Sequence, residues 1–273
     1  MDGLLFGDNH AIPHSYANCF SAVPSLARLM TVTGDMPVGM VLLAPFYQPI
    51  VLAEQIGTLA AFAEAPLYIV LANGGRTQTF EAFGIDMRSR ATRLEELTIV
   101  LRGLLAGERV TFQGRYLQLD GVRVSPRPRV AVEIWLAGTV PAAVARAGTL
   151  GDGWLTGQNS SDAELVAQLD VYREAAAKAR RPARAVLRRD IYVAETDAAA
   201  HAEVDRVLAE GYRGTGKAEL LVGSPDAVVE RFRHYRALGF EEAMVRHIVG
   251  DHQQMLRSFE LIGRHVMPAI RSL

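Results

Sequence analysis

Val38-Gly39-Met40-Val41-Leu42-Leu43 is an unbroken apolar run, and a helical pattern over Ile50–Ala63 follows it. A continuous apolar strand is typical of a parallel sheet whose two faces are both covered. Similar short runs recur along the chain, and longer amphipathic segments separate them. This alternation of strands and helices predicts an α/β fold built on a parallel sheet.

The remaining elements follow from the same two patterns. The runs expected to form strands are Gly3–Phe6, Pro37–Leu43, Leu67–Ala72, Val130–Leu136, Gly153–Leu155, Asp190–Val193 and Ala243–Ile248. The segments expected to form helices are Val23–Thr31, Ile50–Ala63, Ser89–Ala106, Ala142–Thr149, Asp162–Ala179, Ala198–Glu210, Pro225–Leu238 and Gln253–Ile270. Start and stop signals agree with this division: Ser224-Pro225-Asp226 predicts a helix start, and Gly239 predicts its end.

One segment breaks the alternation. Val110–Leu119 has strand propensity on both sides of Gly114, which predicts a β-hairpin inserted after a helix. The hairpin does not belong to the main sheet, so seven strands remain, whereas a closed (β/α) barrel needs eight. Two folds stay open at this point: an open doubly wound sheet, or a barrel that lacks one unit. No Gly/Pro/Ser-rich linker divides the chain, so residues 1–273 are expected to form a single domain.

Composition excludes several classes of protein. The 273 residues carry a formal net charge of -1, with no basic segment that would indicate a nucleic-acid or membrane-surface partner. Cys19 is the only cysteine, which excludes an internal disulfide and a cysteine-based zinc site. No signal peptide or membrane-spanning run is evident, so a cytoplasmic protein is expected. No metal is expected either, because the histidines lack ligand spacing. Those histidines are His201, His234, His247, His252 and His265.

Five stretches, in order and over nearly the whole chain, together resemble the luciferase-like monooxygenase superfamily of flavin- and deazaflavin-dependent oxidoreductases. They are Leu5–His10, Pro49–Gln55, Phe80–Asp86, Phe112–Tyr116 with Ser125–Pro128, and Ile134–Gly138 running to Gly151–Trp154. The resemblance implies a TIM (β/α)8-type barrel with a hairpin insertion. It also implies that the first strand and helix of the family are missing before Phe6-Gly7-Asp8. A homodimer is one way to cover the strand edges that such a gap would expose.

His10 is the candidate catalytic residue. It follows the first predicted strand, and barrel active sites form from the loops after the strands. A histidine suits general acid or base chemistry near neutral pH. The alternative is a loop histidine that only bonds the backbone. The loop His10–Ser21 is expected to shape the substrate pocket.

Two turns are candidates for the cofactor ring. The resemblance implies a non-proline cis peptide in the turn Leu42–Phe46, where the small side chain of Ala44 allows a planar ring to approach. After the next strand, the backbone of Gly74 could approach a ligand closely. Asn73 could donate a hydrogen bond, and Arg76 could pair with a phosphate. Plain turns, with Arg76 facing solvent, are the alternatives.

The phosphate candidate is the turn Ala137-Gly138-Thr139, which joins a predicted strand to a helix. Free amides and the helix dipole attract anions at such a position. Thr139 could add its hydroxyl or cap the helix. The general rule for barrels would place phosphate later, at Gly223-Ser224. The helix-start signal explains that segment without a ligand, so Gly138 and Thr139 are preferred.

The sequence thus predicts an oxidoreductase that uses FMN or the deazaflavin coenzyme F-420 on a small organic substrate. Two alternatives stay open. One is a non-catalytic barrel relative that binds flavin weakly or not at all. The other is a different small-molecule barrel enzyme, such as a lyase, whose likeness lies in the fold alone.

Overall fold

The structure is a computed structural model that describes residues 2–11, 20–212, 219–248 and 251–273. Most of the predicted substrate loop His10–Ser21, including Cys19, therefore lies outside the described residues. The chain divides into two compact units. The amino-terminal unit comprises residues 2–154 and 171–184, and the carboxyl-terminal unit comprises residues 155–170 and 185–273.

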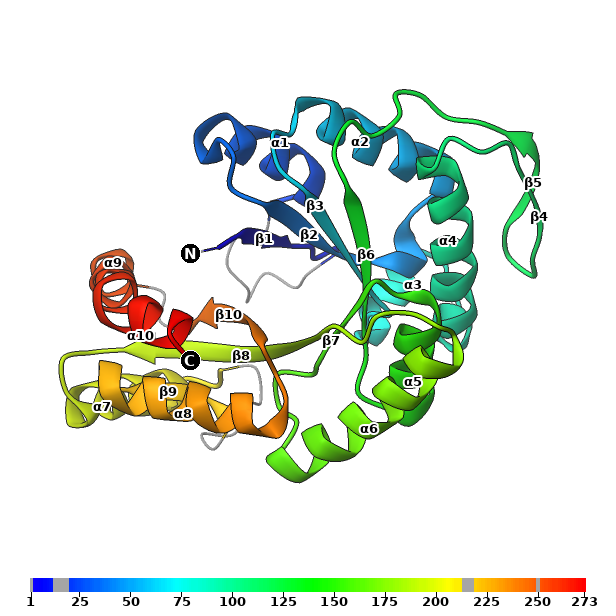
Figure 1. Ribbon diagram of the computed structural model, residues 1–273. Coiled ribbons are helices and arrows are strands. Elements are labelled where there is room, and N and C mark those ends of the chain that lie inside the picture. Colours follow the sequence, from blue (N-terminus) through cyan, green and yellow to red (C-terminus); the bar gives the residue numbers. More distant parts are fainter. Residues whose placement is uncertain (1, 12–19, 213–218, 249–250) are drawn as a thin grey trace. The chain divides into compact units, whose positions relative to one another are not determined.

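The amino-terminal unit is built on a parallel sheet in the order β1-β2-β3-β6-β7. Its strands are β1 (Leu4–Gly7), β2 (Val38–Leu43), β3 (Leu67–Ala72), β6 (Val132–Ala137) and β7 (Gly153–Leu155), of which Leu155 already belongs to the other unit. Its helices are α1 (Ala22–Thr33), α2 (Pro49–Phe62), the short α3 (Thr77–Ala82), α4 (Arg90–Leu105) and α5 (Pro141–Leu150). In Figure 1, α1, α2, α4 and α5 line the outer side of β2, β3 and β6. The run Val38–Leu43 is thus a strand in the interior of a parallel sheet, as its apolar character predicts.

The hairpin is confirmed as β4 (Val110–Gln113) paired antiparallel with β5 (Gln118–Val122), apart from the main sheet (Figure 1). After β5 the chain crosses α2 at Gly57. A Cβ atom at Gly57 would lie 2.1 Å from the carbonyl oxygen of Pro126, which no side chain could tolerate. Glycine is therefore required for this crossing.

Glu96 on α4 holds the hairpin turn. Its carboxylate is nearly buried and accepts hydrogen bonds from the backbone N–H groups of Arg115, Tyr116 and Leu117, at 2.6, 2.9 and 2.9 Å. We expect Glu96→Ala to lower the free energy of unfolding by roughly 2–4 kcal/mol, because three donors lose a charged acceptor. Urea unfolding measures this loss.

The neighbouring Glu95 is the matched control for that prediction. It pairs with Arg146 across 3.2 Å, and its side chain is 49% exposed. An exposed ion pair contributes only about 0–1 kcal/mol, so Glu95→Ala should change stability little. Equal losses in the two variants would contradict the assigned role of Glu96.

The carboxyl-terminal unit is centred on β8 (Ala185–Val193), which pairs parallel with β9 (Leu221–Gly223) and with β10 (Glu242–His247) (Figure 1). Its helices are α7 (Asp197–Ala209), α8 (Pro225–Leu238), α9 (His252–Leu261) and α10 (Met267–Arg271), with a π-helical turn at Ile262–Val266. Helix α6 (Asp162–Lys178) has residues in both units. Among the described residues, no helix combines the length and apolar character that a bilayer crossing requires.

Most predicted elements are confirmed within a few residues, and the differences have local causes. The three-residue strand β9 is absent from the predicted elements, because its residues directly precede the helix-start signal at Ser224. Strand β8 begins five residues earlier than predicted, because Arg188 and Arg189 resemble a loop in the sequence but are buried. The predicted helix Gln253–Ile270 is interrupted before Pro268, which lacks an N–H group for a regular helical bond.

Candidate functional site

The carboxyl ends of four strands meet along one edge of the amino-terminal unit. The register of β1 on β2 places Gly7 beside Val41, and the register of β2 on β3 places Leu43 beside Ala72. The register of β3 on β6 places Leu71 beside Leu136, one residue before β6 ends. The turns after β1, β2, β3 and β6 therefore lie at neighbouring positions on this edge. Together with Ala137, the last residue of β6, they contain the predicted site residues of the amino-terminal unit.

Asp8 is the anchor of this edge. Its side chain is fully buried, and Oδ2 accepts a 2.8 Å hydrogen bond from the Tyr47 hydroxyl. The backbone N–H of Leu43 points at the same oxygen from 3.5 Å. The other oxygen, Oδ1, has no hydrogen-bond partner among the described residues. Asp8 thus ties the end of β1 to the turn after β2 and keeps one acceptor unused.

His10 lies against Asp8. Its Nε2 atom is 2.8 Å from Asp8 Oδ2, and its side chain is 23% exposed. The angles at Nε2 and Oδ2 do not fit a regular hydrogen bond, so the two atoms form a close polar contact. The Thr79 hydroxyl donates to the His10 carbonyl at 3.2 Å. A partly exposed imidazole positioned by a buried carboxylate could act as a general acid or base.

Aromatic rings surround the imidazole of His10. The rings of Phe46, Tyr47 and Phe83 contact it edge-on, with centroids 5.8, 5.8 and 5.5 Å away. This packing is also what the alternative role of His10, as a structural loop residue, requires. The exposed fraction and the contact with Asp8 are the features that packing alone does not explain.

Tyr47 is a residue that the sequence did not reveal. Burial raises the pKa of its phenol far above the ordinary value, and the charge and hydrogen bond of Asp8 raise it further. Tyr47 therefore stays protonated and donates to Asp8 throughout the physiological pH range. A tyrosine after a Pro-Phe turn carries no sequence signal of its own, and its role becomes visible only through Asp8.

The turn after β2 differs from its prediction. Ala44 begins a 3₁₀ turn, Ala44–Phe46, in which the Tyr47 N–H donates to the Ala44 carbonyl at 3.2 Å. The peptide bonds of this turn are trans, so the expected non-proline cis peptide is wrong for this structure. Ala44 is only 2% exposed. Any ring would therefore approach the backbone of the turn and not the methyl group of Ala44.

The turn after β3 places three predicted residues together. Asn73 is half-buried, and its Oδ1 atom is enclosed without a hydrogen-bond partner among the described residues. Gly74 has a φ of +69° and lies beside Phe80, Leu43 and Phe46. Arg76 is half-buried at the start of α3. The enclosed oxygen of Asn73 is an acceptor that would suit a ligand N–H.

The turn after β6 packs tightly on helix α5. A Cβ atom at Gly138 would lie 2.6 Å from the Cβ of Ala143, so only glycine fits. The Gly138 carbonyl accepts from the Trp154 indole at 2.9 Å. Val140 is the N-cap of α5 and makes no side-chain capping hydrogen bond, and Thr139 before it is exposed.

Helix α5 has no acidic residue in its first turn, and Pro141 occupies its start. The positive end of its dipole is therefore not balanced by a local carboxylate. The rival phosphate candidate, Ser224, lies in the carboxyl-terminal unit and caps α8 through its hydroxyl. Its N–H donates to the Asp197 carboxylate at 2.6 Å, and this bond lowers the pKa of Asp197. A protein carboxylate already occupies that helix start, which favours α5.

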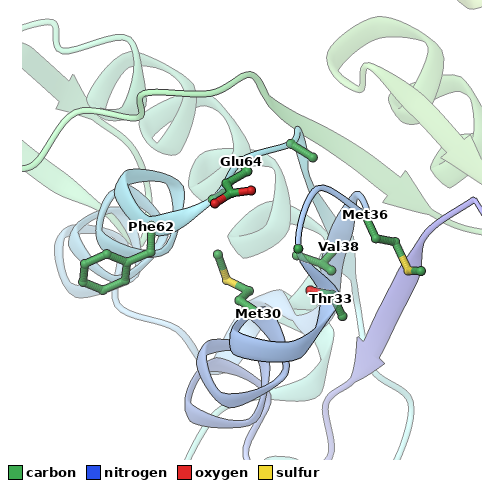
Figure 2. A pocket seen from close by; sticks show the side chains of 9 residues that line it. Met30, Thr33, Met36, Val38, Phe62 and Glu64 are labelled. Carbon is green, nitrogen blue, oxygen red and sulfur yellow. The ribbon is translucent and has the colours of Figure 1, made fainter.

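A small cavity lies at the other ends of these strands (Figure 2). It measures about 40 Å³ and lies between the ends of α1 and α2 and the start of β2. Met30, Val38 and Phe62 are among its apolar lining residues, and Thr33 and Glu64 are its polar ones. Its position away from the carboxyl ends of the strands sets it apart from the candidate site. No group of three potential metal ligands is found in the part of the chain that the structure describes.

The family model for luciferase-like monooxygenases matches residues 1–219. The chain belongs to this family. The resemblance predicted from the sequence is thereby confirmed, on a match that includes the candidate site residues of the amino-terminal unit.

Several known luciferase-like proteins are similar to this chain. An F420-dependent glucose-6-phosphate dehydrogenase from Nakamurella multipartita is 26% identical, over 98% of this chain and 88% of the relative. An F420-dependent hydroxymycolic acid dehydrogenase from Mycobacterium tuberculosis is 28% identical, but the match covers 56% of this chain and 44% of the relative. An FMNH(2)-dependent dimethylsulfone monooxygenase from Pseudomonas fluorescens is 24% identical, over 90% of this chain and 76% of the relative.

Solved structures show the fold. An F420-dependent secondary alcohol dehydrogenase, in complex with an F420-acetone adduct, matches with a TM-score of 0.84 at 16% identity, over 99% of this chain and 90% of that chain. The structural neighbours of this luciferase-like chain are TIM-barrel enzymes, so its fold class is the TIM-barrel type and not the open doubly wound sheet.

Proposed function

We propose that this luciferase-like protein is an oxidoreductase that binds FMN or a deazaflavin coenzyme and acts on a small organic substrate. The coenzyme ring would lie over the turns after β2 and β3, and its phosphate would lie at Gly138-Thr139. Either coenzyme supplies the redox chemistry when bound. The relatives named above use one or the other, which supports both options for this chain.

The observation that carries the proposal is the set of unused polar groups along one strand edge. Asn73 Oδ1 is an enclosed acceptor, and the start of α5 is a positive helix end with no acidic residue in its first turn. A flavin-type coenzyme offers the matching groups, since its ring carries an N–H and its side chain carries a phosphate. The residues present therefore fit such a coenzyme, with Asn73 toward the ring and Thr139 toward the phosphate.

In this proposal His10 exchanges a proton with the substrate, and Asp8 positions its imidazole. The hydroxyl of Tyr47 holds Asp8, and the rings of Phe46 and Phe83 limit the access of water to the imidazole. These roles need no metal and use only groups on the strand edge. The first substrates to test are those named for the relatives: a secondary alcohol, glucose 6-phosphate and dimethylsulfone.

Binding is tested by titrating oxidised FMN and the deazaflavin coenzyme into the purified chain and following fluorescence. We expect saturable binding of one coenzyme, and we expect Thr139→Glu to weaken it by about tenfold or more, since a carboxylate would repel the phosphate. Thr139 is exposed, so this change leaves the packing of Gly138 on Ala143 intact.

The matched control is Thr149→Glu, which adds the same charge at an exposed position in the last turn of the same helix. It should leave coenzyme affinity unchanged. If folded protein binds neither coenzyme, the non-catalytic alternative replaces the proposal. If Thr139→Glu and Thr149→Glu behave alike, the coenzyme binds but its phosphate lies elsewhere.

A further inference from the structure

A cluster of four side chains in the carboxyl-terminal unit carries an unbalanced positive charge. The Arg188–Arg246 cluster consists of Arg188 and Asp190 on β8, Arg246 on β10 and Tyr212 after α7. Strands β8 and β10 lie side by side, and their register pairs Arg246 with Asp190 (Figure 1). Because strand side chains alternate, Arg188 and Asp190 project from the same face of β8. None of these residues belongs to the site proposed above.

Asp190 is the hub of the cluster. Its side chain is fully buried, and its Oδ1 lies 2.7 Å from Nη1 of Arg188. Its Oδ2 lies 2.5 Å from Nη2 of Arg246 and accepts from the Tyr212 hydroxyl at 2.9 Å. Both oxygens of the single carboxylate are thus engaged, and two guanidinium groups share them.

The charge of the cluster does not balance. Two guanidinium groups face one carboxylate, which leaves one positive charge in a site where Arg188 is only 10% exposed. Burial is the main reason that the pKa of Arg188 lies below its usual range. Asp190 acts in the opposite direction, and Arg246 lowers this pKa further. A buried charge without a partner is costly, so an additional anion would stabilise this arrangement.

The cluster also has unused donors. Within the described residues, Arg246 makes its hydrogen bonds through Nη2 alone, to Asp190 and to Tyr212. The guanidinium group of Arg188 makes its contacts through Nη1, which forms an ion pair with Asp190 and donates to the Arg189 carbonyl. The side chain of Arg246 is 30% exposed, so solvent reaches the cluster. Guanidinium donors in this arrangement match the oxygens of a phosphate or carboxylate group.

We propose that the Arg188–Arg246 cluster is a binding site for the oxyanion group, phosphate or carboxylate, of a small-molecule ligand. If the cluster only tied β8 to β10, one arginine and Asp190 would suffice for the tie. The second guanidinium, the excess charge and the accessible donors of Arg246 are what an anion site adds. This inference does not depend on the coenzyme site, because it uses residues of the carboxyl-terminal unit alone.

Calorimetric titration of the full chain with inorganic phosphate and with acetate, at constant ionic strength set by sodium chloride, tests the proposal. We expect saturable binding of at least one anion. Arg246→Gln should weaken it by about tenfold or more, because it removes a charged donor pair. Tighter binding of phosphate assigns the site to phosphoryl groups, and tighter binding of acetate assigns it to carboxylates.

Three further variants make the result decisive. Arg233→Gln removes an exposed arginine that pairs with Glu230 on α8 and should bind the anion like the unchanged protein. Thr139→Glu blocks the predicted phosphate position on α5, so anion binding that survives it and is weakened by Arg246→Gln belongs to the Arg188–Arg246 cluster. Arg246→Lys keeps the positive charge beside Asp190 but lacks the planar guanidinium group with its paired donors. Its affinity for the anion should therefore lie between those of the unchanged protein and Arg246→Gln, and it can be measured even if Arg246→Gln does not fold.

The proposal is overturned if neither anion binds saturably to the folded, unchanged protein. It is equally overturned if Arg246→Gln, with an unchanged thermal midpoint, binds the anion as tightly as Arg233→Gln does.

Discussion

Replacing His10 with asparagine is expected to lower turnover by about 10²–10⁴-fold, the usual contribution of one positioned general acid or base. The buried carboxylate of Asp8 lies 2.8 Å from the imidazole, and the partly exposed face of the ring is left for a substrate. Coenzyme affinity should stay within about threefold, since no coenzyme contact is assigned to His10 and a loss of 1.4 kcal/mol would already be tenfold. Steady-state turnover and coenzyme titration on the same samples measure the two quantities.

Two variants complete this experiment. His265→Asn changes an exposed histidine of the π-helical turn and should leave turnover unchanged. Asp8→Asn keeps the size of the side chain but removes the charge, and should lower turnover less than His10→Asn does. Unchanged turnover in His10→Asn would show that His10 only fills the space between Phe46 and Phe83.

Arg189→Met is expected to lower the free energy of unfolding by roughly 3–5 kcal/mol, since each buried acceptor left unpaired costs about 1–3 kcal/mol. The side chain of Arg189 is fully buried. It donates to the carbonyl oxygens of Gly157, Gln158 and Ser160, at 3.3, 3.1 and 2.7 Å. It also donates to the Tyr235 hydroxyl at 3.0 Å.

Methionine fills similar space, so the variant isolates the hydrogen bonds. Replacing a buried ion pair with apolar groups is often neutral, because both charged partners leave together. In Arg189→Met the acceptors are mainly backbone carbonyls, which stay buried after the guanidinium group is removed. The variant therefore leaves them without a hydrogen-bond donor. Urea unfolding measures the loss.

Tyr235→Phe, which removes one partner, should lose about 1 kcal/mol in the same assay. The exposed Arg233→Gln should be within about 0.5 kcal/mol of the unchanged chain. A loss below that of Tyr235→Phe would contradict the role assigned to Arg189.

Apolar patterning carried most of the fold prediction. The strand Pro37–Leu43 and the helices Ile50–Ala63 and Pro225–Leu238 are predicted from local signals, and the structure places these elements within one residue of their predicted bounds. Strand β8 shows where the patterning fails. Arg188, Arg189 and Asp190 look solvent-exposed in sequence, and only partners distant in the chain explain their burial.

The candidate site was partly predictable for the same reason. The resemblance and the strand-end rule located His10, Asn73 and Gly138 on one edge. Those signals are local to each turn. Asp8 and Tyr47 owe their roles to a contact between two turns 39 residues apart, which no single segment encodes. The cis peptide expected near Ala44 was wrong because a family resemblance does not determine the geometry of one bond.

Gly57 has a consequence for how homologous chains could diverge. The backbone crossing at Pro126 leaves no room for a side chain on α2, so one base of the hairpin is fixed in place. Insertions and deletions at that crossing would have to open the helix surface. At the other end, changes in the tip would break the hydrogen bonds of Arg115, Tyr116 and Leu117 to Glu96. Evolutionary variation in this insertion should therefore spare both contacts, so that Gly57 and Glu96 stay the same while the residues between them and the exposed strand faces change.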